Sequence, residues 1–181
     1  DELQSQRELF DRIKVTIGLG QLSTGIANLA ASLGEAEAAI ANRLIHGPGR
    51  IIERYADQDL VGIVNRVITP EVRKRLLQGV EILDESEIAS VLENVASAVA
   101  ADTHMNGKAI HALCDECIQI LRFGLKSQNA VDDWVEERQG NVLMKLGMCN
   151  SQRDIFHVLA SYASSLVAHV VERKKSENSK P

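Results

Sequence analysis

The sequence predicts an all-α fold, a multi-helix bundle of six to eight helices. Apolar residues recur at the helical period of about 3.6 along most of the chain, and no stretch alternates as a half-buried strand would. Signals for helix starts precede several of these segments. Hydrophobic residues make up 45% of the 181 residues but aromatic residues only 3%. Small aliphatic side chains must therefore build the core, which suits closely packed helices.

Apolar stripes mark the successive helices. The first contains many β-branched residues, but its spacing of i, i+1, i+4, i+7 and i+8 favours a helix over a strand. We expect the stripe residues to form the core. In chain order the stripes are Leu60/Val61/Val64/Val67/Ile68, Val72/Leu76/Val80/Leu83, Ile88/Val91/Leu92/Val95/Val99, Ile110/Leu113/Cys117/Leu121/Leu125, Val131/Trp134/Val135/Val142/Leu146 and Ile155/Val158/Leu159/Tyr162/Leu166/Val170.

Side chains that can accept a hydrogen bond from a free backbone N–H mark the helix starts. Thr69 precedes Pro70, and proline at the first helical position loses nothing by lacking an N–H. The further pairs of this kind are Asp84 with Glu87, Asn129 with Asp132, and Asn150 or Ser151 with Asp154.

The spacing of the helix starts leaves a second architecture open. Starts near residues 84, 106, 129 and 150 are separated by 22, 23 and 21 residues. Two such helices give a period close to the ~40–47 residues of HEAT and armadillo repeats. No residue signature repeats with this period, so the alternative is a short HEAT/armadillo-like helical array resembling those proteins in spacing alone.

The chain is expected to form a single helical domain over residues 1–171, followed by a disordered polar tail over 172–181 (ERKKSENSKP). The opening DELQSQRELFD is acidic and polar, unlike a secretory signal peptide. Three cysteines are too few, and odd in number, for a disulfide framework. We therefore expect the cytoplasm or another intracellular reducing compartment.

The stretch Val15–Gly34 contains no charged residue and has about the length of a membrane span. It also contains several polar residues and glycines, which disfavour a spanning helix. Gly18, Gly25 and Ser32 are spaced by seven residues, so on a helix they would let a second backbone approach closely. We expect a central buried helix here, continuous or broken near Gly18-Leu19-Gly20; self-association and membrane insertion are the alternatives.

Opposite charges concentrate in neighbouring segments. No Lys or Arg occurs from Leu76 to Gly107, whereas the segment from Arg43 to Arg75 is rich in arginine. One interpretation is that carboxylates decorate a helix N-terminus and arginines a solvated face. The functional interpretation is a pair of partner-binding surfaces. The candidate partner-binding residues are Arg73, Lys74, Arg75, Asp84, Glu85 and Glu87.

The segment around His111, Cys114 and Cys117 could bind a metal ion or act in redox chemistry, because these side chains step by three along a predicted helix. Cys114 lies inside that helix rather than at its start, and the chain has no second CxxC pair. We therefore expect ordinary buried thiols, with no metal and no cofactor. Serine-elbow, phosphate-loop and dinucleotide motifs are absent from the sequence, which argues against an enzyme.

These observations predict a non-catalytic helical protein-interaction or assembly module that acts through helix faces and self-associates. Its partner is a protein or a second copy of the chain. The net charge of -5 and the scarcity of aromatic residues disfavour nucleic acid. The alternatives are a membrane-active domain using residues 15–34, and a metal or redox site at His111, Cys114 and Cys117.

Overall fold

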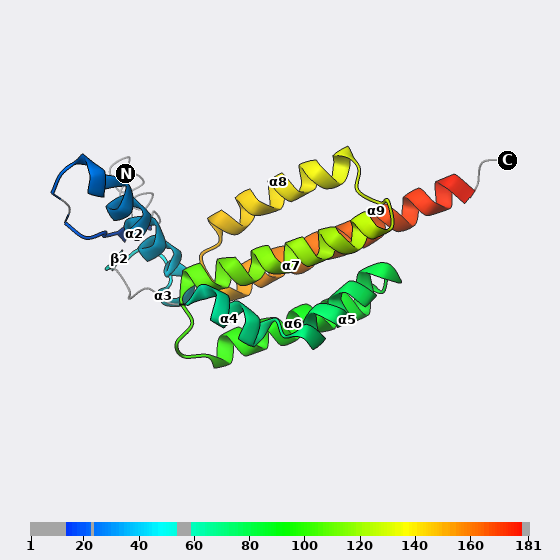
Figure 1. Ribbon diagram of the computed structural model, residues 1–181, viewed down its shortest axis with the longest axis horizontal. Coiled ribbons are helices and arrows are strands. Elements are labelled where there is room, and N and C mark those ends of the chain that lie inside the picture. Colours follow the sequence, from blue (N-terminus) through cyan, green and yellow to red (C-terminus); the bar gives the residue numbers. More distant parts are fainter. Residues whose placement is uncertain (1–13, 23, 54–58, 179–181) are drawn as a thin grey trace, which may run out of the picture. The chain divides into compact units, whose positions relative to one another are not determined.

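The computed structural model describes residues 14–22, 24–53 and 59–178, and these are mostly helical (Figure 1). The predicted all-α multi-helix bundle is confirmed. The described chain divides into two compact units. Unit 1 lies within residues 1–58 and 106–108, and unit 2 within 59–105 and 109–181. The polar opening segment (residues 1–11) lies outside the described residues.

Unit 1 combines short helices with a minimal parallel pairing of two strands. Its elements are β1 (Ile17–Gly18), η1 (Ile26–Asn28), α2 (Leu29–Ala41), α3 (Arg43–His46) and β2 (Ile51–Ile52). Ile17 pairs with Ile51 and Gly18 with Ile52. The strands are joined by hydrogen bonds of 3.0 Å from the Ile17 amide to the Arg50 carbonyl and from the Leu19 amide to the Ile52 carbonyl.

The prediction that Val15–Gly34 forms one central helix is wrong. Its first part is β1 and the following loop, and α2 begins only at Leu29. Small residues do allow a close approach, but of the β1 segment to α2: a Cβ on Gly18 would overlap the Ala36 carbonyl oxygen. Ser32 of α2 donates from Oγ to the Gln21 carbonyl at 2.7 Å. Gly25 lies in a turn with a φ of 92°, a conformation that favours glycine.

Unit 2 is a helical bundle. Its helices are α4 (Leu60–Val67), α5 (Pro70–Glu81), α6 (Glu85–Ala101), α7 (Gly107–Ser127, its first residues belonging to unit 1), α8 (Asp133–Met148) and α9 (Gln152–Asn178). In Figure 1, α7 runs between α8 and the α5/α6 pair. The helix α6 packs against both α5 and α9, and α8 packs against α9. A linear repeat array would bring only successive helices together, so the contact of α6 with α9 indicates a bundle.

The core of unit 2 follows the predicted stripes closely. All predicted stripe residues of α6 and α7 are buried, as are most of those of α9. On α7 burial extends further, to Cys114, Ile118 and Ile120, so that α7 occupies the central place predicted for residues 15–34. Two stripe residues are exposed instead: Val61 of α4, where Ile63 and Ile68 are buried, and Trp134 of α8.

Three predicted helix starts are confirmed by side-chain caps. Thr69 Oγ1 accepts from the Val72 amide at 3.3 Å, Asp84 Oδ1 from the Glu87 amide at 3.0 Å, and Ser151 Oγ from the Asp154 amide at 3.1 Å. Each cap satisfies an N–H that has no partner within the helix.

The predicted start at Asn129 is wrong, because Asn129 belongs to the cap that follows the end of α7 at Ser127. It has a φ of 52°, and the Ala130 amide donates to the Leu125 carbonyl at 2.9 Å, as in a Schellman motif. Asp132 is the true cap of α8, accepting at Oδ1 from the Val135 amide at 3.0 Å. Asparagine occurs at both kinds of position, so the residue type alone did not distinguish a helix start from a helix end.

The prediction of a disordered tail from Glu172 is also wrong for the described part, because α9 continues to Asn178. Arg173 donates from Nη2 to the Asn129 carbonyl at 3.0 Å, and Lys174 from Nζ to Gln128 Oε1 at 2.8 Å. These contacts hold a polar helical extension that the composition alone does not indicate.

We expect Asn129→Ala to lower the free energy of unfolding by about 1 kcal/mol, because alanine tolerates the left-handed conformation less well than asparagine. Asn129→Gly should be at least as stable as the parent chain. Asn94→Ala, on the exposed face of α6, is the control and should not destabilise, since alanine has the higher helix propensity. Urea denaturation measures all three, and an undiminished stability of Asn129→Ala would contradict this account.

Candidate protein-binding groove

The predicted basic residues lie on α5, and two of them form ion pairs within unit 2. Arg73 pairs with Glu116 of α7, and Arg75 Nε donates to Glu87 Oε1 of α6 at 2.7 Å. The contact with Glu87 also raises the pKa of Arg75. Lys74 is exposed and has no polar partner among the described residues. Only Lys74 of this cluster is therefore uncommitted within the fold.

The predicted acidic residues also make contacts within the unit. Asp84 caps α6, as described above, and Glu85 accepts a hydrogen bond from Ser164 Oγ of α9. Glu87 accepts from Arg75. This arrangement favours the structural interpretation of these carboxylates over a free acidic surface.

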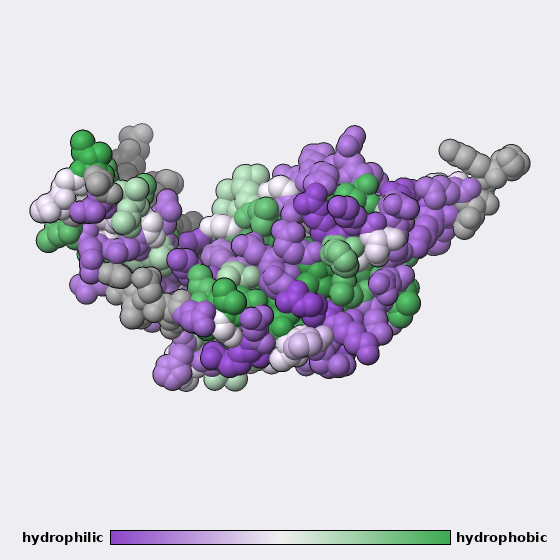
Figure 2. Space-filling model, viewed as in Figure 1, coloured by the Kyte–Doolittle hydropathy of each residue, from purple (hydrophilic) through white to green (hydrophobic). Residues whose placement is uncertain are grey.

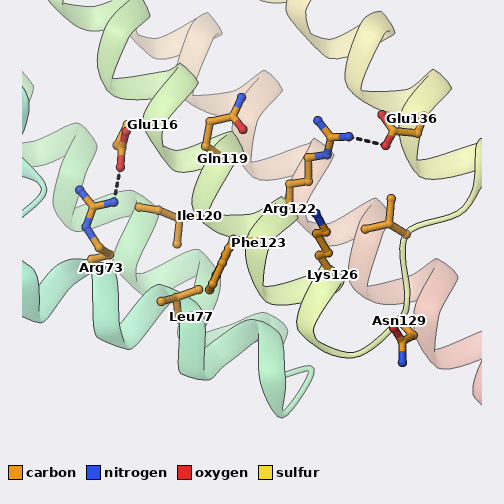
Figure 3. Close-up of a pocket in the computed structure, with 11 residues that line it drawn as sticks. Arg73, Leu77, Glu116, Gln119, Ile120, Arg122, Phe123, Lys126, Asn129 and Glu136 are labelled. Atoms are coloured by element: carbon orange, nitrogen blue, oxygen red, sulfur yellow. Dashed lines mark hydrogen bonds and ion pairs between the residues drawn. The ribbon is translucent and has the colours of Figure 1, made fainter.

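A groove of about 900 Å³ opens over α7, between α5 and the start of α8 (Figure 3). We call it the α7 groove. Its lining combines an apolar floor with charged walls. The residues that line it are Arg73 and Leu77 of α5, Glu116, Gln119, Ile120, Arg122, Phe123 and Lys126 of α7, Asn129 and Val131 of the following loop, and Glu136 of α8.

Phe123 is the main apolar feature of the groove. Its side chain is 65% exposed, whereas Ile120 beneath it is buried. Figure 3 shows Phe123 and Leu77 directed toward one another across the floor. Apolar residues are exposed among hydrophilic ones on the face of unit 2 seen in Figure 2. A large exposed aromatic ring in a groove is a common feature of binding surfaces.

The walls of the groove are held by ion pairs, Arg73 with Glu116 and Arg122 with Glu136 (Figure 3). Lys126 has no polar partner among the described residues and is exposed. Both carboxylates of the lining are paired with arginine. The groove therefore combines an apolar floor, two ion pairs and one exposed lysine.

A second exposed apolar surface lies on unit 1. Leu22, Ile26, Leu29 and Leu33, which we call the apolar stripe, are all at least 60% exposed, and Ile26 reaches 91%. Ile26, Leu29 and Leu33 follow one another by three and four residues along η1 and α2, and Leu22 lies in the preceding loop. The uncharged stretch thus exposes its large side chains, whereas the sequence predicted their burial.

The cysteines are buried and free. Burial raises the pKa of Cys117 to about 12 and that of Cys114 well above its usual range, so both stay thiols at neutral pH. Among the described residues, no three His, Cys, Asp or Glu side chains are grouped so that they could hold a metal ion. The three-ligand cluster of His111, Cys114 and Cys117 considered from the sequence is not formed.

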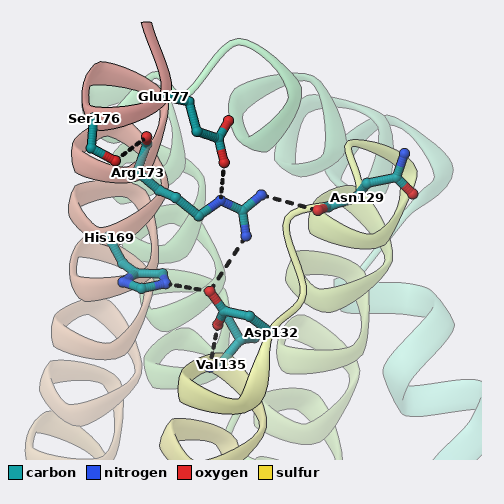
Figure 4. Close-up of polar contacts among 7 residues, drawn as sticks. All are labelled: Asn129, Asp132, Val135, His169, Arg173, Ser176 and Glu177. Carbon is teal, nitrogen blue, oxygen red and sulfur yellow. Dashed lines mark hydrogen bonds and ion pairs between the residues drawn. The ribbon is translucent and has the colours of Figure 1, made fainter. Parts of the chain in front are cut away.

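A polar cluster that the sequence did not indicate joins α8 to α9 (Figure 4). Asp132 Oδ2 lies 2.8 Å from His169 Nε2 and 3.4 Å from Arg173 Nη1. The His169 ring stacks on Trp134, with centroids 4.1 Å apart. The hydrogen bond from His169 is the main cause that lowers the pKa of Asp132. One carboxylate therefore caps α8 and holds α9.

No family model, curated protein or solved structure matches this chain. Of the helices in the described ranges, only residues 152–177 of α9 are long and apolar enough to cross a membrane. Part of this helix is buried inside unit 2. Core helices can meet the same criterion of length and apolar composition.

We expect Asp132→Ala to lower the free energy of unfolding by about 1–2 kcal/mol at pH 7, because α8 loses its cap. Since the pKa of Asp132 is lower in the folded than in the unfolded protein, its stabilisation is full above pH ~5. It is lost as the pH falls through the lowered folded value.

The difference in free energy of unfolding between Asp132→Ala and the parent chain should therefore shrink as the pH falls below about 4, the usual pKa of a free aspartate. The control is Asp133→Ala, at the exposed neighbouring position, which should show a smaller change. If the difference in free energy of unfolding stays constant down to pH 2, ionised Asp132 does not stabilise the fold.

Proposed function

We propose that the chain is a non-catalytic helical protein-interaction and assembly module, and that its α7 groove binds an amphipathic helix of a protein partner. The observation that carries this proposal is the exposed Phe123 on an apolar floor between two ion-paired walls. Free, buried thiols support an intracellular reducing compartment such as the cytoplasm.

The shape and chemistry of the groove suit a helix. Helix-in-groove recognition inserts apolar side chains spaced by three or four residues into a hydrophobic cleft. Phe123, Leu77 and Ile120 provide such a floor. Binding would bury the Phe123 ring, and complete burial of a side chain of this size contributes about 1.5–3 kcal/mol. Aromatic residues at the centre of an interface often dominate its binding energy.

The charges of the groove favour an acidic partner. Arg73 and Arg122 are already neutralised by carboxylates of the same unit. Lys126 lines the groove, and Lys74 lies beside it in a shallow hollow shared with Arg73 and Leu77. Both lysines lack a polar partner among the described residues. Carboxylates beside the apolar face of the incoming helix would pair with them.

We test this with two fluorescent amphipathic peptides of about 15 residues that share one leucine stripe and differ only in glutamate or lysine flanks. The glutamate peptide should bind more tightly, as measured by anisotropy. Phe123→Ala should weaken its binding about tenfold or more, because the apolar anchor is lost. Lys126→Gln should weaken the glutamate peptide but not the lysine peptide.

The matched control is Leu143→Ala, which truncates another exposed apolar side chain of unit 2, on α8 and outside the groove. It should leave peptide binding unchanged. Equal losses for Phe123→Ala and Leu143→Ala, with circular dichroism intact, would rule out the groove as the binding site.

Self-association is supported by a separate observation, the apolar stripe of unit 1. We propose that it pairs with the same stripe of a second copy. No charge occurs between Val15 and Gly34, so two stripes can meet without electrostatic repulsion. Ile26, Leu29 and Leu33 are spaced by three and four residues, as in the seam of paired helices. The stripe is short, so after the cost of association we expect a weak dimer, with a Kd of roughly micromolar or above.

Light scattering across a concentration series should show the parent chain dimerising, and the double variant Ile26→Glu/Leu29→Glu remaining monomeric. Val61→Glu/Ile82→Glu, which changes exposed apolar residues of unit 2, is the control and should dimerise normally. Liposome flotation distinguishes membrane binding by the apolar stripe from self-association. A monomeric chain that floats with liposomes, and stops floating in the Ile26/Leu29 variant, would assign the stripe to a membrane instead.

A further inference from the structure

A second hollow lies between α8 and α9, with chemistry unlike that of the α7 groove. Its volume is about 170 Å³. Residues three and seven positions apart on α8 line one side, and residues four positions apart on α9 line the other, so each helix contributes one face. Its polar lining consists of Arg138, Asn141 and Lys145 of α8, and His157, Ser161 and Tyr162 of α9.

The lining contains hydrogen-bond donors and positive charge but no carboxylate. This contrasts with the α7 groove, where Arg73 and Arg122 are each paired with a glutamate. Here the ammonium of Lys145 has no ion-pair partner among the described residues. The Arg138 guanidinium makes only a cation–π contact there, 5.7 Å from the centroid of the Trp134 ring. The positive charge of the hollow is therefore available to a ligand.

Tyr162 adds a buried hydroxyl to the residues that line the hollow. Its side chain is only 3% exposed, and its hydroxyl is buried without a hydrogen-bond partner in the described part of the chain. Buried hydroxyls without a partner are uncommon, because desolvation is costly unless the lost hydrogen bonds are replaced. Burial is the main cause that raises the pKa of Tyr162 to about 12, and the charged groups that also act on it are Arg122 and Glu136.

We propose that the hollow between α8 and α9 binds a small phosphate-bearing anion. Arg138 offers a planar fork of donors suited to two phosphate oxygens, and Lys145 offers a compact positive charge. The Asn141 amide, the Ser161 hydroxyl and a ring nitrogen of His157 can donate further hydrogen bonds. The site is separate from the α7 groove, and it does not depend on the proposed protein-binding function.

The test is a titration of the full-length, ¹⁵N-labelled chain with inorganic phosphate at constant ionic strength, followed by NMR. Chemical-shift changes should concentrate on the facing surfaces of α8 and α9. Lys145→Met should weaken binding about five- to tenfold, because it removes one charge-assisted contact and keeps a similar aliphatic stem. Lys126→Met, which removes the free lysine of the α7 groove, is the matched control and should bind phosphate like the parent chain.

Tyr162→Phe separates a ligand-binding role from a structural one. The hydroxyl has no partner in the free protein, so its removal should leave the urea midpoint unchanged or slightly raised while phosphate affinity falls. Unchanged phosphate affinity in both Lys145→Met and Tyr162→Phe would overturn the proposal, as would shift changes spread over the basic residues of the whole chain.

The source of the phosphate group is resolved by competition. Glycerol 3-phosphate and vesicles containing phosphatidic acid present the same monoester in soluble and in lipid form. Displacement of inorganic phosphate by glycerol 3-phosphate alone supports a soluble ligand. Displacement by the vesicles, lost in Lys145→Met, supports a lipid headgroup.

Discussion

The burial of α7 is the constraint on which the arrangement of unit 2 depends. Its buried residues, among them Ile110, Leu113, Ile118 and Leu125, point to more than one side of the helix. A helix with so wide an apolar surface must be surrounded by others. Glycine helps at one point, because a Cβ on Gly124 would press against Val80 of α5. In the second half of α7, the exposed side chains of Gln119, Phe123 and Lys126 line the α7 groove.

The sequence indicated the fold well where the signal was local. The stripe from Ile88 to Val99 is buried as expected, and Thr69, Asp84 and Ser151 cap helices as expected, because the helical period and the cap act within one or two turns. The sequence did not indicate the features of the fold that depend on contacts between distant segments. Gly18 serves an approach of β1 to α2, and Arg173 extends α9 by reaching back to Asn129. Neither partner can be inferred from neighbouring residues.

The candidate site shows the same division. Arg73 was singled out for its charge and does line the α7 groove, but Glu116, 43 residues away, neutralises it. Phe123 and Lys126 were not singled out. Phe123 lies two residues beyond Leu121, about 200° around the helix and off the predicted stripe. A large apolar residue off the buried stripe is the signal that could have identified it. Lys126 has no polar partner among the described residues, and whether a distant helix supplies one cannot be inferred from a local sequence pattern.

Asp132 gives the fold a property that neither α8 nor α9 would have alone. Its two carboxylate oxygens serve different helices, Oδ1 the first turn of α8 and Oδ2 the last turns of α9 through His169 and Arg173. Fraying of the end of α9 therefore loosens the carboxylate that orders the start of α8, and the reverse also holds. Local openings that would otherwise be independent become one cooperative event. Amide protons at the start of α8 and near the end of α9, far apart in the sequence, should then exchange with solvent as a single unit.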